Sequence, residues 1–133
     1  MTEESKKLAE AIAYAAWEKL ADNVTVMFVG DLVGYTDYFV VCTGRTDRHV
    51  NAIADGISDT IRINQRAKPF GTEGRSSGRW ICLDYVDVVV HVMSEPVREF
   101  YQLEKLWGDA PRLSLPVPEW MNDPARQVSG VFR

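Results

Sequence analysis

The feature that most constrains the fold is a run of three valines, Val88-Val89-Val90, in which apolar and polar residues do not alternate. A strand with this pattern is typically buried on both faces, as in sheets that carry helices on both sides. Two further runs rich in β-branched residues, Val24 to Val29 and Tyr38 to Thr43, also predict strands. The chain is therefore expected to build a sheet with helices packed on it.

Three segments show the spacing of apolar side chains that predicts helices with one buried face. They span residues 3 to 20, about 46 to 65 and about 96 to 106. In the second helix, Gly56 costs about 1 kcal/mol relative to alanine, so tertiary packing must offset it. In the third helix, one face is expected to carry Phe100, Leu103 and Trp107.

These elements together predict an α/β protein with a mixed β-sheet of about five strands and packed helices. A short strand and a loop are expected between 68 and 78, followed by paired strands at 79 to 84 and 88 to 93. The passage through the second helix should be a right-handed crossover. After Gly108, four prolines interrupt every periodic pattern. We therefore predict a domain of residues 1 to 110 and an irregular tail of residues 111 to 133, whose apolar residues available for docking are Leu113, Leu115, Val117 and Trp120.

Length and composition narrow the class of protein. A chain of 133 residues with 46% apolar and 26% charged residues can form one domain with a conventional core. This composition excludes a disordered, collagen-like or disulfide-scaffold protein. Fifteen Lys and Arg against nineteen Asp and Glu give a net charge of −4. The acidic balance disfavours non-specific binding to phosphate backbones, leaves a local basic patch possible, and indicates a basic partner surface.

The two cysteines, Cys42 and Cys82, lie within apolar runs and are interpreted as buried reduced thiols, with a disulfide left open. Because the chain has no CxxC pair and no Cys/His cluster, we expect neither a structural zinc site nor another cofactor. Glu3 and Glu4 argue against a signal or transit peptide. No apolar run approaches the ~20 residues that span a bilayer. A cytoplasmic protein with no membrane partner is therefore expected.

Three features of the sequence are candidates for an anion site, a metal site or a general base. The corner from Thr43 to Thr46 joins a strand to a helix, where N–H groups attract anions, but it has neither Walker nor GxGxxG spacing. A plain turn is the simpler interpretation. Asp84 and Asp87 flank a turn and do not share one strand face, as a metal-binding pair would. His91 lies in no nucleophile motif, so a structural or contact role is favoured over a general base.

The stretch from Trp80 to His91 is the densest mixture of aromatic, apolar and acidic residues. In a strand, Trp80, Cys82 and Asp84 face one way, while Ile81 and Leu83 face the other. If the first side is outward, it combines a large apolar anchor with a charge, as binding hot spots do. The alternative, with Trp80 in the core and Asp84 as a turn former, has equal support from spacing alone.

Several motifs in order resemble the ribosomal silencing factor (Iojap-like) family, over roughly residues 5 to 110. The matching motifs are Thr36-Asp37-Tyr38-Phe39-Val40-Val41, Thr43-Gly44-Arg45-Thr46-Asp47-Arg48-His49-Val50-Asn51-Ala52-Ile53-Ala54-Asp55, Glu73-Gly74, Trp80, Leu83-Asp84-Tyr85, Val88-Val89-Val90-His91 and Arg98-Glu99-Phe100-Tyr101-Gln102-Leu103-Glu104-Lys105-Leu106-Trp107.

The resemblance implies a nucleotidyltransferase-like fold without catalytic residues. It also implies binding to the large ribosomal subunit through the protein called L-fourteen. Such binding blocks joining of the small subunit and represses translation when nutrients are short. Isolated members are often homodimers, and no sequence-specific contact with nucleic acid is expected. The residues that we predict to bind the partner are Trp80, Leu83, Asp84, Tyr85, Asp87 and His91.

One position departs from the family pattern. Val86 stands where the family usually has glycine, and a β-branched residue resists positive φ. The connection between Asp84 and Asp87 is therefore expected to differ. Two alternatives stay open beside the silencing factor: a metal-dependent nucleotidyltransferase that uses the Thr43–Thr46 corner and the two aspartates, and an assembly factor of the large subunit.

Overall fold

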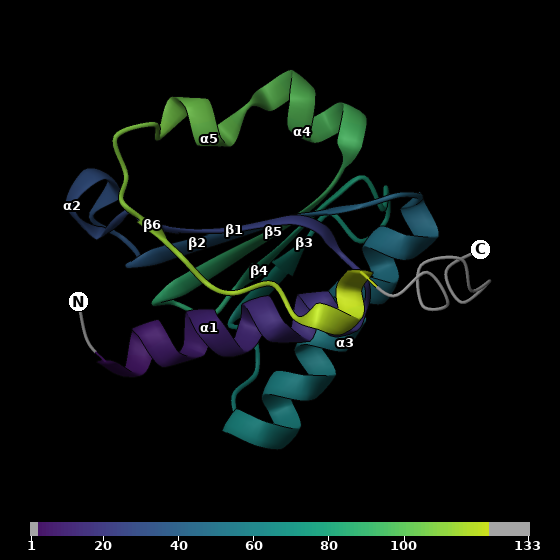
Figure 1. The fold of residues 1–133 in the computed structure, drawn as a ribbon, viewed down its shortest axis with the longest axis horizontal. Helices are drawn as coiled ribbons and strands as arrows, with labels where there is room; N and C mark the ends of the chain where they lie inside the picture. Colours follow the sequence, from purple (N-terminus) through teal and green to yellow (C-terminus); the bar gives the residue numbers. More distant parts are fainter. Residues whose placement is uncertain (1–2, 123–133) are drawn as a thin grey trace.

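The computed structural model describes residues 3–122 and confirms an α/β fold (Figure 1). Most of the predicted helices and strands lie within a few residues of their expected bounds. Thr46 begins the second long helix as predicted, because its Oγ1 accepts a hydrogen bond from the His49 N–H at 3.0 Å. The elements are α1 (Glu3–Glu18), β1 (Asp22–Phe28), α2 (Gly30–Val33), β2 (Tyr38–Gly44), α3 (Asp47–Gln65), β3 (Gly71–Glu73), β4 (Trp80–Asp84), β5 (Val88–Ser94), α4 (Glu95–Tyr101), α5 (Leu103–Leu106), β6 (Arg112–Leu113) and a 3₁₀ turn, η1 (Glu119–Asn122).

A mixed sheet of six strands, one more than expected, forms the centre of the fold, in the order β3-β4-β5-β2-β1-β6. Only β2 and β5 run parallel, with α3, β3 and β4 between them in the chain, and every other neighbouring pair is antiparallel. The parallel pair lies in the middle of the sheet and is almost wholly buried, as the unbroken valine run predicted.

Helices α1 and α3 cover one face of the sheet. Apolar side chains from both helices pack there against residues such as Val40, Leu83 and Val90. Gly56 of α3 lies where a Cβ atom would come within 3 Å of the Lys19 side chain, so its small size permits close approach of the two helices. This packing offsets the loss of helix stability that glycine causes relative to alanine.

Helices α4 and α5 lie over the other face, but they cover only part of it (Figure 1). Val97, Leu103 and Trp107 pack there on a smaller apolar cluster that includes Phe39 and Met93. Helix α4 lies mainly over β5 and β2 and reaches β4 through Tyr101, whose ring contacts Trp80, while a cavity lined by residues of β3, β4 and β5 opens beside it.

The third predicted helix is broken in two. Gln102 adopts a left-handed conformation with φ 48° between α4 and α5, which turns the second segment relative to the first. As a result Phe100 does not share a buried face with Leu103 and Trp107, and its side chain is 80% exposed. The sequence pattern was wrong here because the apolar spacing assumed one continuous helix.

The segment after residue 110 contains more regular structure than the sequence predicted. Arg112 and Leu113 pair with β1 as the edge strand β6, and η1 follows. Leu113, Leu115 and Trp120 pack against the core as expected, whereas Val117 is 56% exposed. The predicted tail from 123 to 133 lies outside the described residues.

The connection between β4 and β5 contains a strained residue. Val86 has φ 73°, and the Asp87 N–H donates to the Tyr85 carbonyl oxygen at 2.9 Å, which closes a γ-turn. The expectation that valine would avoid positive φ is therefore wrong. The Asp84 carboxylate offsets part of the strain, because its Oδ1 accepts the Val86 N–H at 2.8 Å.

Val86→Gly is expected to stabilise the fold by about 1 kcal/mol, since glycine removes the strain of positive φ but has more freedom in the unfolded chain. The midpoint of thermal unfolding should rise by about 4 °C. Val117→Gly is the matched control, because Val117 is equally exposed and has no positive φ. An unchanged or lower midpoint for Val86→Gly would show that the turn is not strained.

Candidate functional site

Strand β4 presents two different faces. Ile81 and Leu83 are fully buried against α1 and α3, while Trp80, Cys82 and Asp84 point to the uncovered side and are half-buried. The predicted alternation of β4 is therefore confirmed. In the antiparallel register, Cys82 lies opposite His91, and Asp84 lies opposite Val89. We call the surface formed by Trp80, Cys82, Asp84, Val89 and His91 the open face.

Two of the six residues predicted to bind a partner do not belong to this surface. Leu83 has no exposed area and Tyr85 is 7% exposed, and both pack in the core on the opposite side of the sheet. Their predicted contact with a partner is therefore wrong, because neither side chain is accessible on this surface. Asp87 is exposed beyond the turn, where its backbone carbonyl accepts the N–H groups of Asp37 and Tyr38.

A cavity of about 710 Å³ opens on the open face. Its floor is apolar, and the carboxylates of Glu73 and Asp84 lie on its wall. Three exposed apolar side chains border it: Phe70 is 84%, Tyr35 66% and Val86 54% exposed. An exposed apolar surface with carboxylates at its side is typical of a binding site for a basic protein partner.

The Trp80 side chain is held in place by its neighbours. Its indole Nε1–H donates to Nδ1 of His91 at 3.1 Å, and its ring lies 4.8 Å from the Tyr101 ring of α4. Since Nδ1 of His91 accepts this bond, a neutral His91 carries its proton on Nε2. The indole is thus preorganised in the free protein, which lowers the entropy cost of using it as an anchor.

Two side chains of the open face, His91 and Cys82, are neutral at pH 7. Burial lowers the pKa of His91 to about 4. Burial, with the nearby carboxylates of Glu73 and Asp84, raises the pKa of the Cys82 thiol to about 11. A general base works best with a pKa near the working pH, and a cysteine nucleophile needs its thiolate form. Both side chains are therefore suited to contact a partner and poorly suited to catalysis.

The lowered pKa of His91 predicts a pH-dependent stability. The unfolded chain binds a proton on His91 near pH 6.5, and the folded chain binds it only near pH 4. The contribution of this group to the free energy of unfolding is therefore fully present above pH 6.5 and is lost as the pH falls below it. The free energy of unfolding from urea titrations should drop by about 1 kcal/mol between pH 7 and 5.5 through this group. In His91→Gln most of this drop should disappear, with His49, whose pKa burial also lowers, accounting for the remainder. An equal drop in both proteins would contradict the assignment.

At the corner from Thr43 to Thr46, between β2 and α3, backbone N–H groups already have hydrogen-bond partners within the chain. The Arg45 N–H donates to Nδ1 of His49 at 2.9 Å, the His49 N–H is bound by Thr46, and His49 Nε2 lies 2.7 Å from the Lys19 carbonyl oxygen. These backbone donors are thus engaged by the chain itself.

Within residues 3–122, no three His, Cys, Asp or Glu side chains are grouped to hold a metal ion. No helix in the same range is long and apolar enough to cross a membrane.

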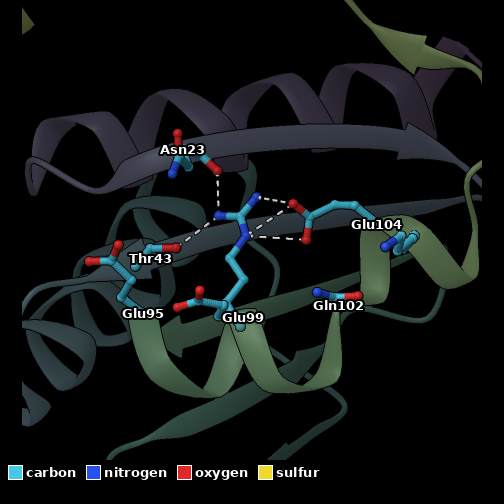
Figure 2. Close-up of a pocket in the computed structure, with 8 residues that line it drawn as sticks. Asn23, Thr43, Glu95, Glu99, Gln102 and Glu104 are labelled. Atoms are coloured by element: carbon cyan, nitrogen blue, oxygen red, sulfur yellow. Dashed lines mark hydrogen bonds and ion pairs between the residues drawn. The ribbon is translucent and has the colours of Figure 1, made fainter.

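A second cavity, of about 370 Å³, lies beside α4 and contains the buried Arg98 (Figure 2). The Arg98 guanidinium donates to the Glu104 carboxylate at 2.8 Å, the Asn23 carbonyl oxygen at 2.6 Å and Thr43 Oγ1 at 2.8 Å. A further N–H reaches Thr25 Oγ1 at 3.2 Å. With its donors used in this way, Arg98 ties α4 and α5 to β1 and β2 and offers little to an external ligand.

Sequence reasoning missed several residues of the site. Tyr35, Phe70 and Glu73 lie in loops or at the sheet edge, and the fold brings them beside the open face. The signal in the sequence was an aromatic residue within each of two polar, glycine-containing connections, where no core position is available. Cys82 was predicted on the correct side of β4 but was not assigned to the partner surface.

Comparison with known proteins agrees with this geometry. Residues 2–129 match the family model described as "Ribosomal silencing factor during starvation". A Bacillus subtilis ribosomal silencing factor is 38% identical over 111 residues, covering 83% of this chain and 92% of that protein. The chloroplast protein Iojap of Arabidopsis thaliana is 32% identical over 113 residues, which cover 85% of this chain but 47% of that protein.

Two solved structures share the fold. A crystal structure of a Chromobacterium violaceum protein has a TM-score of 0.76 at 27% identity and covers 90% of this chain and 98% of its own. One from Bacillus halodurans has a TM-score of 0.70 at 32% identity, with 86% and 100% covered. The match of the family model over nearly the whole chain, together with these likenesses, means that this chain belongs to the ribosomal silencing factor family.

Proposed function

We propose that this protein binds the large ribosomal subunit through the open face and so prevents the small subunit from joining, which represses translation under nutrient limitation. The observation that carries the proposal is the open face itself: two carboxylates, Glu73 and Asp84, line a largely apolar cavity, and a preorganised Trp80 lies on the same face beside it. Membership in the family supports the ribosome as the target.

Electrostatics supports a ribosomal protein as the direct partner. Ribosomal proteins are generally basic, and this chain has a net charge of −4 with Glu73 and Asp84 at the cavity. Opposite charges speed association and select the partner. We propose L-fourteen as that partner, with Lys or Arg side chains paired to the carboxylates. Trp80, Asp84 and His91 keep their predicted role, and Asp87 contributes from the adjoining turn.

The proposed mechanism needs no chemistry. A body bound on the contact surface of the large subunit excludes the small subunit by volume, and the neutral His91 and Cys82 fit a contact role. The protein is thus proposed to be a non-enzymatic cytoplasmic factor, homodimeric when isolated, with residues 1 to 110 as the binding domain.

Reassociation of purified ribosomal subunits tests this function. Subunits mixed with saturating protein should remain separate on a density gradient, and a Trp80→Ala variant should restore their joining. The nucleotidyltransferase alternative makes a different prediction, a dose-dependent rise in melting temperature with ATP and magnesium. Normal joining in the presence of saturating wild-type protein would refute the proposed function.

A role in assembly is a second candidate. A mouse relative, 35% identical over 89 residues that cover 65% of this chain and 39% of that protein, is named "Mitochondrial assembly of ribosomal large subunit protein 1". An assembly factor should bind immature large subunits more tightly than mature ones. A silencing factor should bind mature subunits at least equally well, so comparing the two affinities separates these roles.

A further inference from the structure

One part of this acidic chain is strongly basic. From Thr60 to Thr72 the sequence contains no Asp or Glu but has three cations, Arg62, Arg66 and Lys68. They lie at the C-terminal end of α3 and in the segment that follows it. We call these three residues the basic tip. Their concentration contrasts with the chain's net charge of −4.

The basic tip projects into solvent. Figure 1 shows the last turns of α3 extending beyond α1, away from the sheet. The five residues from 62 to 66 are all exposed, and so is Lys68. Arg62 lies in the last turn of α3, and Arg66 directly follows the helix. Arg62 pairs with Asp59 at 3.3 Å, but both side chains are more than half exposed, so a stronger anion can replace this contact.

Arg66 occupies a backbone position that suits glycine. It ends α3 in a left-handed conformation with φ 54° and ψ 34°, where its N–H donates to the Ile61 carbonyl oxygen. Glycine is the common residue at such helix ends because it adopts this conformation without strain. Arg66 thus places a positive charge at the exposed end of α3, in a conformation that glycine would adopt with less strain.

The basic tip lies close in sequence to the open face. Phe70, two residues after Lys68, already borders the cavity beside Asp84, and its N–H donates to the Asp84 carbonyl oxygen at 2.6 Å. The end of α3 lies on the α1 side of the sheet, and the short segment from Lys68 to Phe70 joins it to the edge of the open face, so a partner that extends past this edge reaches the basic tip. On a large ribosomal subunit, the abundant anionic surface next to a basic protein is the RNA backbone.

We propose that the basic tip binds ribosomal RNA phosphates next to the protein partner, as a second, sequence-independent contact. This inference rests on the proposed function, since it assumes that the open face docks on the large subunit. The acidic open face selects the protein, and the basic tip adds affinity from phosphates. Two surfaces of opposite charge then fix the orientation in which the factor lies on the subunit.

Salt dependence of binding tests the proposal. The triple variant Arg62→Gln, Arg66→Gln, Lys68→Gln should bind large subunits more weakly at 50 mM KCl. Each phosphate contact releases counterions, so the wild-type protein should lose affinity faster than the variant as salt is added. The ratio of the variant's Kd to the wild-type Kd should therefore fall about 100-fold between ~50 and ~500 mM KCl. This corresponds to a slope of log Kd against log salt that is lower by roughly 2 in the variant. Arg112→Gln, an exposed charge on the opposite edge strand, is the matched control and should leave the slope unchanged.

A single variant separates binding from folding. Arg66→Gly removes the charge and relieves the backbone strain, so the melting temperature should rise while affinity at low salt falls. If Arg66 served only to stabilise the end of α3, affinity would not fall. Hydroxyl-radical probing should also show RNA riboses that the wild-type protein protects and the triple variant does not.

The outcomes distinguish the two proposals. If Trp80→Ala weakens binding but the triple variant keeps the wild-type slope, the RNA contact is refuted and the proposed function stands. If the slope falls without loss of any RNA protection, the basic tip binds an acidic protein surface and the RNA assignment is wrong. If Trp80→Ala binds normally, the docking role of the open face fails first.

Discussion

Trp80→Ala is expected to raise the Kd for the large ribosomal subunit by 30-fold or more, equivalent to about 2 to 4 kcal/mol. The indole is half-buried, packs against the tilted Tyr101 ring and is oriented by a hydrogen bond to His91. A large aromatic side chain that is already ordered gives contact area at little entropy cost, which is why tryptophan dominates many interfaces. Co-sedimentation with purified large subunits over a range of protein concentrations measures the change.

The control for this prediction removes an aromatic ring from the other side of the protein. Tyr14 of α1 is 40% exposed and contacts Trp17, on the face of the sheet opposite the open face. Tyr14→Ala should leave subunit binding unchanged. Wild-type affinity in a folded Trp80→Ala protein would remove Trp80 from the interface.

Arg98→Met should destabilise the fold by about 3 kcal/mol, because it leaves the partners of a buried guanidinium unpaired. Methionine keeps most of the apolar stem, but the Asn23 carbonyl and Thr43 hydroxyl lose their donor. Glu104 is 26% exposed and can regain some water, which keeps the loss at the low end of the range. Urea unfolding at pH 7 measures this free energy.

Arg45→Met is the matched control, since Arg45 pairs with Asp22 at 3.1 Å but both side chains are more than 40% exposed. Its expected cost is below about 1 kcal/mol. Arg98→Met should also weaken subunit binding, because α4 carries the Tyr101 ring that contacts Trp80. Similar losses of stability in the two variants would show that burial does not strengthen the Arg98 network.

The central part of the fold was predictable because its signals are local and repeated. The valine run in β5 and the β-branched run in β2 indicate the two buried central strands, and the apolar stripe of α3 indicates a helix that packs on them. The break at Gln102 was not predictable in this way, since a left-handed residue that is not glycine or asparagine leaves no mark in the sequence. Its position depends on Arg98, whose partners are up to 75 residues away.

The candidate site was predictable along a strand but not across the sheet. Alternation placed Trp80, Cys82 and Asp84 on one side of β4, as observed. Which side is covered depends on where α4 and α5 pack, and this is a tertiary property. Leu83 and Tyr85 were therefore assigned to the partner surface although they lie in the core, while Phe70 and Tyr35 were overlooked because only folding brings them near β4.

The two borders of the sheet, β3 with three residues and β6 with two, have a consequence for behaviour at high concentration. Cross-β fibrils grow when a long, flat strand offers its free amides and carbonyls to another molecule, and neither border supplies one. Within residues 3–122, neither border of the sheet therefore offers crowded copies a long template for fibril nucleation, even though several aromatic rings are exposed.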